Sequence, residues 1–170
     1  MRFLTFLGSY ARISMLLAGL TACFTLTGCA MIMKSATSDL MDHLSSAILN
    51  NNDLKTVEQG APSYLLLIDS LIAKDPENEK MLTSAANLYG SYASLFVDTP
   101  ERSKKMAEKA LGYAKQAVCL NHAPACKITG LPFDRFERVI AGMEPDNVPA
   151  LYALGNAWAR WIIANSDDMN

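Results

Sequence analysis

Thr99-Pro-Glu-Arg-Ser-Lys-Lys-Met-Ala-Glu-Lys-Ala-Leu-Gly-Tyr-Ala-Lys-Gln-Ala-Val118 is the stretch that decides the fold of this chain of 170 residues. Threonine is a good N-cap, proline fits the first helical turn, and an acid there interacts favourably with the helix dipole. Apolar residues then recur every three or four positions, which predicts an amphipathic helix. Its predicted inward face is Met106, Ala107, Ala110, Leu111, Ala114, Ala117 and Val118.

The rest of the chain has the same helical character. Leu, Ala, Met, Lys and Glu, which favour helices, dominate the composition. Strand-like alternation and the Asn-Gly or Asp-Gly turns of hairpins are absent from the sequence. The sequence therefore predicts an all-α fold.

Local signals divide the chain into further helices. We expect one helix from Ser38 to about Asn50, a short turn from Asp53 to Val57, and a break at Gly60-Ala61-Pro62. A new helix is then expected from Pro62 to Lys74, because proline is accepted in a first turn and costly inside a helix. The next helix is expected over Glu79 to Phe96.

Two more helices are expected near the C-terminus. The first follows Pro132, and the second runs from Val148-Pro149 to about Asn165. Their predicted inward residues are Phe133, Phe136, Val139 and Ile140 in the first, and Leu151, Leu154, Gly155, Trp158, Trp161 and Ile162 in the second.

Helices of this length joined by short turns form either a bundle or a solenoid of helical hairpins. Asp75-Pro76 between two helices matches the spacing of tetratricopeptide repeats. Ala107, Leu111 and Ala114 also reproduce the small–large–small pattern of the second helix in such a repeat. We therefore favour a tetratricopeptide-like helical-hairpin solenoid with irregular repeats, because the usual tryptophan of the first helix is missing.

The N-terminus has the pattern of a bacterial lipoprotein signal peptide. Arg2 and Arg12 precede an apolar stretch that ends in Leu26-Thr-Gly-Cys29, where the cysteine thiol would receive the lipid, a palmitate-bearing diacylglycerol. Two alternatives are a lipidated Cys23 and an uncleaved membrane anchor over residues 13–33, which is long enough to span a bilayer. All three place the C-terminal body outside the cytoplasm.

The predicted organisation follows from that cleavage. Residues 1–28 are the signal peptide, 29–37 a tether, 38–165 the helical-repeat domain and 166–170 a disordered tail. Ala30, in place of the aspartate that often retains lipoproteins in the inner membrane, favours the outer membrane. The net charge of −2 for the whole chain becomes more negative without the two arginines. An acidic domain of this kind is not expected to bind nucleic acid.

Residues that could carry chemistry are few. The two histidines, His43 and His122, belong to no catalytic or phosphate-binding motif, so we expect no enzyme activity and no cofactor. Cys119 and Cys126 end a helix and favour a disulfide, since the compartment is oxidising. A metal site that adds His122 is the weaker alternative, because it supplies only three ligands.

Four aromatic residues at helical spacing have two interpretations. Tyr89, Tyr92, Trp158 and Trp161 belong either to the core or to a groove that binds a ligand or a partner segment. The lysines of the stretch quoted first, interleaved with Glu101 and Glu108, are expected to form a solvated face (Lys104, Lys105, Lys109 and Lys115).

Several weak motifs, taken in order, resemble a known family. They are the lipobox at Cys29, Gly60-Ala-Pro62, Leu65-Leu-Leu-Ile-Asp69, Pro76-Glu-Asn78, the Ala-Ala-Asn-Leu-Tyr-Gly-Ser-Tyr-Ala segment at 85–93, and Val148-Pro-Ala-Leu-Tyr152 with Ala157-Trp158 and Trp161-Ile162. Together they resemble the T-component (TatT) lipoproteins of tripartite ATP-independent periplasmic (TRAP) transporters.

The resemblance implies a function. Members of that family are tetratricopeptide-like, are thought to form homotrimers, engage the transporter's periplasmic substrate-binding protein, and have a cavity suggested for a hydrophobic ligand. The resemblance therefore implies a non-enzymatic, lipid-anchored accessory of TRAP transport that faces the periplasm. The alternative is a helical-repeat scaffold lipoprotein of another cell-envelope assembly.

Overall fold

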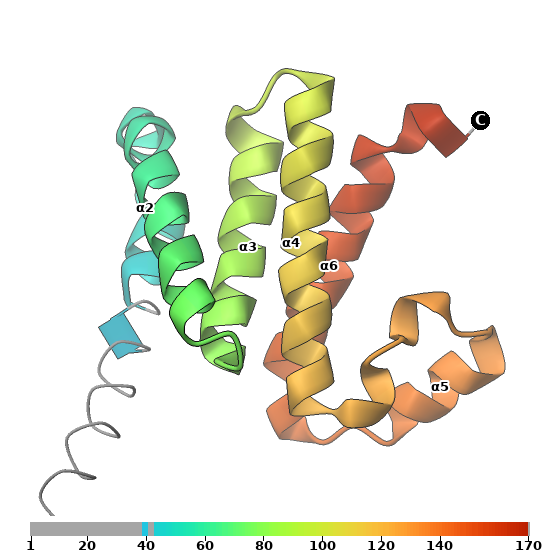
Figure 1. Cartoon of the computed structure of the whole chain (residues 1–170). Coiled ribbons are helices and arrows are strands. Elements are labelled where there is room, and N and C mark those ends of the chain that lie inside the picture. Colours follow the sequence, from blue (N-terminus) through green and yellow to red (C-terminus); the bar gives the residue numbers. More distant parts are fainter. Residues whose placement is uncertain (1–38, 41–42, 170) are drawn as a thin grey trace, which may run out of the picture. The chain divides into compact units, whose positions relative to one another are not determined.

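The computed structural model describes residues 39–40 and 43–169 (Figure 1). The chain divides between Leu40 and Met41, and only the second part is described below. The predicted signal peptide, tether and lipidation site, with both candidate cysteines Cys23 and Cys29, lie outside the described residues.

The described part is built from helices, and no strand occurs in it. Residues 43–49 are helical. The long helices that follow are α2 (Leu54–Lys74), α3 (Glu79–Phe96), α4 (Pro100–Asn121) and α6 (Val148–Ala164). The shorter elements are α5 (Phe133–Ala141) and the 3-10 turns η1 (Ala123–Ala125), η2 (Ile128–Gly130), η3 (Pro145–Asn147) and η4 (Ser166–Met169). The all-α prediction is confirmed.

Caps fix the helix ends close to where the sequence predicted them. Asn78 accepts a hydrogen bond from the backbone N–H of Met81 at 3.1 Å and starts α3. Thr99 precedes α4, with Pro100 in the first turn, although its side chain makes no cap hydrogen bond. Pro149 lies in the first turn of α6. The predicted bounds of α3 are confirmed, as are the predicted starts of α4, α5 and α6.

The expected break at Gly60-Ala61-Pro62 is wrong, because α2 runs without interruption through Pro62. Asp53 caps the helix early by accepting from the N–H groups of Lys55 at 3.0 Å and Thr56 at 3.2 Å. Proline lacks the N–H that would bond to the carbonyl four residues earlier, which here is that of Glu58. The Tyr92 hydroxyl of α3 donates to this carbonyl at 3.2 Å instead. A contact from the neighbouring helix therefore compensates for the proline.

Consecutive helices pack side by side, as Figure 1 shows for α2, α3 and α4. Helix α6 packs against α4 and also contacts α3. This succession of paired neighbours is the predicted helical-hairpin solenoid. One core runs through it, and its most deeply buried large side chains are Ile68, Leu82, Val118, Ile128 and Leu154.

Three predicted inward residues are exposed. Phe133 and Ile162 expose 75% and 44% of their surface, and Gly155 is also exposed. The core side of α6 is instead formed by Ala150, Ala153, Leu154 and Ala157. Because α6 contacts both α3 and α4, its buried face is the alanine-rich one and not the face predicted from the positions of its tryptophans.

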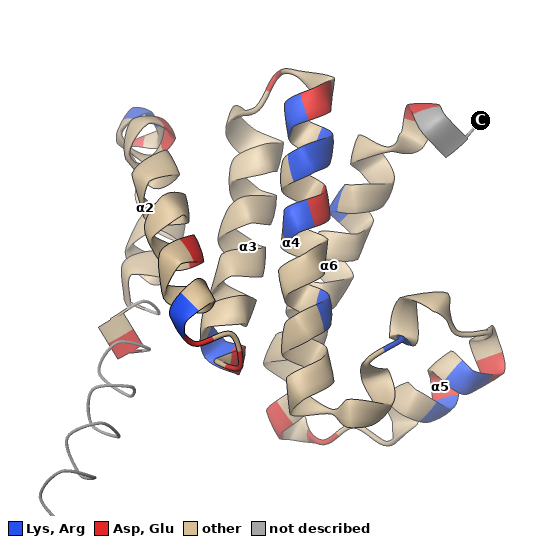
Figure 2. Ribbon diagram, viewed as in Figure 1, with Lys and Arg blue, Asp and Glu red and all other residues tan. Residues whose placement is uncertain are grey.

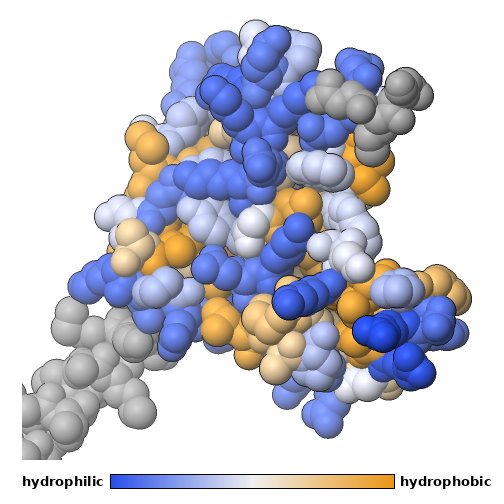
Figure 3. Space-filling model, turned by 45° about the vertical axis from the view of Figure 1, so that its right-hand side comes forward, coloured by the Kyte–Doolittle hydropathy of each residue, from blue (hydrophilic) through white to orange (hydrophobic). Residues whose placement is uncertain are grey.

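Charge is unevenly distributed over these helices (Figure 2). Helix α3 carries charge only in its first two residues, and the single charge of α6 is Arg160. The first half of α4 carries lysines, arginine and glutamates together. On the face shown in Figure 3, hydrophobic residues are exposed between the hydrophilic ones. None of the helices described is long and apolar enough to cross a membrane.

The compensation of Pro62 by Tyr92 leads to a prediction. Tyr92→Phe leaves the Glu58 carbonyl without its donor and should lower the free energy of unfolding by about 1–2 kcal/mol, measured by urea denaturation. Pro62→Ala is the matched background, because alanine restores an N–H for that carbonyl. In the Pro62→Ala chain, Tyr92→Phe should lower the free energy of unfolding by clearly less than it does in the native chain. Equal losses in the two chains would contradict the compensation of Pro62 by Tyr92.

Candidate functional site

An apolar pocket of about 240 Å³ lies between the helix at 43–49, α2 and α3. Among the residues that the structure describes, none that lines it is charged. Its lining is Ile48, Leu49, Asn51, Leu54, Val57, Ala61, Tyr64, Leu65, Leu88, Ser91, Tyr92, Leu95 and Phe96. Pockets for complete drug-sized ligands are larger, from about 300 Å³ upward, so this pocket suits one apolar chain or ring of a ligand.

Two tyrosines form walls of this pocket. The Tyr64 hydroxyl lies 3.4 Å from Ser45 Oγ and connects α2 to the helix at 43–49. The Tyr92 ring packs against Phe96 with centroids 5.4 Å apart, and the Arg102 guanidinium lies over its face at 5.8 Å. The same Tyr92 donates to the Glu58 carbonyl, so the wall is held by a directional bond.

Exposed leucines belong to the same pocket. Leu49, Leu54 and Leu95 line it and expose 49%, 62% and 65% of their surface. Exposed apolar residues that are contiguous with a pocket mark binding surfaces more often than scattered ones do. An apolar ligand that reaches into the pocket would cover them.

A polar cluster lies where α2, α3 and α4 meet. Asp69 of α2 accepts hydrogen bonds at 2.7 Å from the hydroxyl groups of both Tyr89 of α3 and Tyr113 of α4. Lys109 of α4 forms an ion pair with Asp69 and lies 3.1 Å from the Tyr89 hydroxyl. Its ammonium also lies 4.7 Å from the centre of the Tyr89 ring. The cluster joins three helices through one carboxylate.

The cluster fixes the charge of its members. Partial burial alone would raise the pKa of Asp69, but hydrogen bonds from Lys109, Tyr89 and Tyr113 and the lysine charge outweigh it, so this pKa lies below its usual value. Burial, then the hydrogen bond to Asp69 and its charge, raises the pKa of Tyr89 and of Tyr113. The carboxylate is therefore charged and both tyrosines act as donors at neutral pH.

The lysines of α4 are only partly a solvated face. Lys105 and Lys109 are exposed, as predicted, whereas Lys104 and Lys115 are partly buried. The exposed Lys109 also pairs with Asp69, 40 residues earlier, which the sequence did not predict.

The four aromatic residues of the predicted groove are not brought together. Tyr89 belongs to the polar cluster and Tyr92 to the apolar pocket. Trp158 and Trp161 lie between α4 and α6, where they line a different, more open hollow of about 390 Å³ with Leu111, Gly112, Lys115, Glu108 and Thr129. Tyr89 and Tyr92 are buried, and the two tryptophans are partly buried. Tyr64, a pocket wall, was missed because only the packing of its neighbours reveals it.

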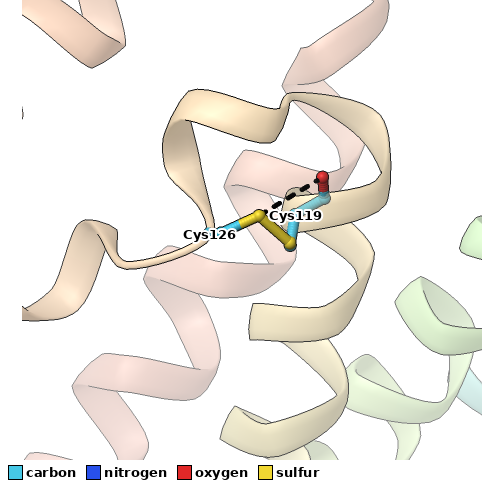
Figure 4. Close-up of a disulfide and its surroundings, with 2 residues drawn as sticks. All are labelled: Cys119 and Cys126. Atoms are coloured by element: carbon cyan, nitrogen blue, oxygen red, sulfur yellow. Dashed lines mark hydrogen bonds between the residues drawn. A yellow bond between two sulfur atoms is a disulfide. The ribbon is translucent and has the colours of Figure 1, made fainter.

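Cys119 and Cys126 lie with their sulfur atoms at bonding distance and their Cα atoms 4.2 Å apart (Figure 4). Cys119 is in the last turn of α4 and Cys126 follows η1. His122, the third residue of the alternative metal site, is the C-cap of α4. Within the residues that the structure describes, no group of three or more His, Cys, Asp or Glu could hold a metal ion.

Comparison with known proteins identifies the family. The family described as "TRAP transporter T-component" matches residues 50–170. This range covers the long helices, the polar cluster and the cysteine pair. No curated protein and no solved structure matches the chain.

The depressed pKa of Asp69 predicts a dependence of stability on pH. Such a carboxyl contributes stability that is complete above its ordinary pKa of 3.8 and is lost as the pH falls through the lower pKa of the folded state. Asp69→Asn should therefore be destabilised by about 1–2 kcal/mol at pH 7.

The difference in free energy of unfolding between Asp69→Asn and the native chain should become smaller below about pH 4, as measured by denaturant titrations. Glu137→Gln, on the exposed side of α5 and beyond its first turn, is the control because it removes a carboxylate charge away from the cluster. A difference that is independent of pH would contradict an ionised Asp69 as the source of the stability.

The cysteine pair leads to another prediction, that the disulfide forms in the native compartment. Protein isolated without reductant should leave Cys119 and Cys126 unlabelled by a thiol reagent, as read by mass spectrometry. Replacing both by serine should cost about 2–3 kcal/mol of stability, because the bond restricts the unfolded chain. Complete labelling of both residues before reduction would show that the bond is absent.

Proposed function

The chain belongs to the TRAP transporter T-component family, and from this premise we propose that it is a non-enzymatic accessory that binds the transporter's periplasmic substrate-binding protein and a hydrophobic ligand. The family match over residues 50–170 is the observation that carries the transport role. The apolar pocket between α2 and α3 supports the ligand.

The chemistry of the pocket favours an apolar ligand. The lining residues that the structure describes carry no charge to neutralise an ionic group, and their polar groups are Asn51, Ser91 and the two tyrosine hydroxyls. Burying an ionised group there without a partner would be costly, whereas an alkyl chain or ring gains about 0.8 kcal/mol for each buried CH₂. The ligand we propose therefore has an apolar part inside the pocket and its polar part outside.

Lipid on Cys29 completes the proposal. The cysteine ends the lipobox and lies outside the described residues. A lipid there would anchor the protein with its helical domain in the periplasm, on the outer membrane by preference. Because a lipid anchor confines the protein to a surface, it raises the protein's effective concentration near other membrane-associated components.

One preparation tests the proposal. The full-length chain, tagged at its C-terminus and expressed in its own host, is crosslinked in intact cells, purified from the envelope and analysed by mass spectrometry. We expect enrichment of a TRAP substrate-binding protein and an N-terminal peptide that begins at lipid-modified Cys29. Recovery of envelope-assembly proteins without any substrate-binding protein would favour the scaffold alternative and overturn the proposal.

The same preparation tests the ligand. Organic extraction should release an apolar compound, and Ser91→Trp should lose most of it because the indole fills the pocket from α3. Ser70→Trp, on the exposed side of α2, is the matched control and should retain the compound. Equal amounts from the two variants would place the ligand elsewhere.

A further inference from the structure

The outward face of α6 is apolar. Val148, Tyr152 and Ile163 expose 56%, 68% and 73% of their surface, and Gly155 and Ala159 between them are also exposed. These positions recur at helical spacing and form one stripe along the helix. The helix at the end of a solenoid needs a polar outer face to stay soluble. This stripe therefore has the character of an interface.

Arg160 lies at the edge of the stripe, on the side that faces α3. Its Nη1 donates to Ser94 Oγ of α3 at 3.1 Å. Its side chain crosses Gly90, where an added Cβ atom would lie 3.1 Å from Arg160 Cδ and 3.6 Å from Nε. The missing side chain at position 90 thus leaves room for the arginine to lie across α3.

The guanidinium has binding capacity left. It carries five N–H donors, and Ser94 is the one hydrogen-bond partner found for it among the described residues. Burial lowers the pKa of Arg160, an effect that nearby Tyr152 opposes. A partly desolvated cation is costly unless an anion pairs with it. A carboxylate is the natural partner, because it can accept two parallel bonds from the guanidinium.

We propose that Arg160 and the apolar stripe of α6 form a docking face (Val148, Tyr152, Gly155, Ala159, Arg160 and Ile163) for a segment of the substrate-binding protein that presents a carboxylate beside apolar side chains. This inference rests on the proposed function, which supplies that partner. Arginine and tyrosine are the residues most often found at the energetic centre of protein interfaces.

A two-fold contact, in which this face packs against the same face of a second copy, fits it less well. Helix α6 contains no Asp or Glu. A symmetric contact between two copies of the same face would therefore leave both Arg160 side chains without a carboxylate. An acidic segment of a different protein satisfies both the charge and the apolar stripe.

Binding measurements test the docking face. The protein purified from the envelope is immobilised and titrated with the purified substrate-binding protein of the same transporter by biolayer interferometry. Arg160→Gln and Ile163→Asp should each weaken the affinity at least about tenfold. Arg160→Lys should recover part of the loss, since it keeps the charge but not the paired donors. Arg138→Gln, on the exposed side of α5, is the matched control and should bind like the native chain.

The outcomes separate this inference from the proposed function. If the native chain binds the substrate-binding protein and both α6 variants bind equally well, the docking face is wrong and the proposed function stands. If the native chain does not bind, both are overturned. If Ile163→Asp changes the sedimentation coefficient and leaves the affinity unchanged, the stripe is a contact between copies of the chain. Thermal unfolding followed by circular dichroism verifies that each variant is folded.

Discussion

Alanine at the helix contacts is the constraint on which the rest of the structure depends. Where α3, α4 and α6 meet, the most buried side chains are largely alanines, each at most 2% exposed (Ala85, Ala86, Ala110, Ala114, Ala117, Ala150, Ala153 and Ala157). Small side chains let helices approach closely. Larger aromatic side chains lie beside these contacts: Tyr89 and Tyr113 pack against each other with ring centroids 5.9 Å apart, Tyr64 and Tyr92 wall one hollow, and Trp158 and Trp161 line another.

Helix α2 is held in a different way. Besides its apolar contacts it makes directional bonds: Asp69 accepts from Tyr89 and Tyr113, and the Glu58 carbonyl accepts from Tyr92. Apolar packing alone tolerates sliding of one helix along another, whereas hydrogen bonds of defined length fix the register. The apolar pocket is bordered by this helix, so its walls keep a defined position even though its lining is largely apolar.

The sequence predicted the features whose causes are local. The start of α3 depends on Asn78 and the start of α4 on Pro100, each within a few residues of the helix that it begins. The continuity of α2 could not be predicted, because the donor that compensates Pro62 lies 34 residues beyond Glu58. The ion pair of Lys109 could not be predicted for the same reason, since its partner is 40 residues away. Helical spacing shows which residues share a face but not which helix covers that face, and so the sequence could not show that Tyr92 and the two tryptophans line different hollows.

Helix α3 connects the two proposed surfaces. Leu88, Ser91 and Tyr92 line the apolar pocket on one side, and Gly90 and Ser94 contact Arg160 on the other. The two sets belong to the same two turns of a helix whose backbone is rigid on that scale. A ligand that displaced α3 would therefore also move Gly90 and Ser94, the residues that position Arg160. If the ligand changes the affinity for the substrate-binding protein, thermodynamic linkage requires that protein to change the affinity for the ligand by the same factor.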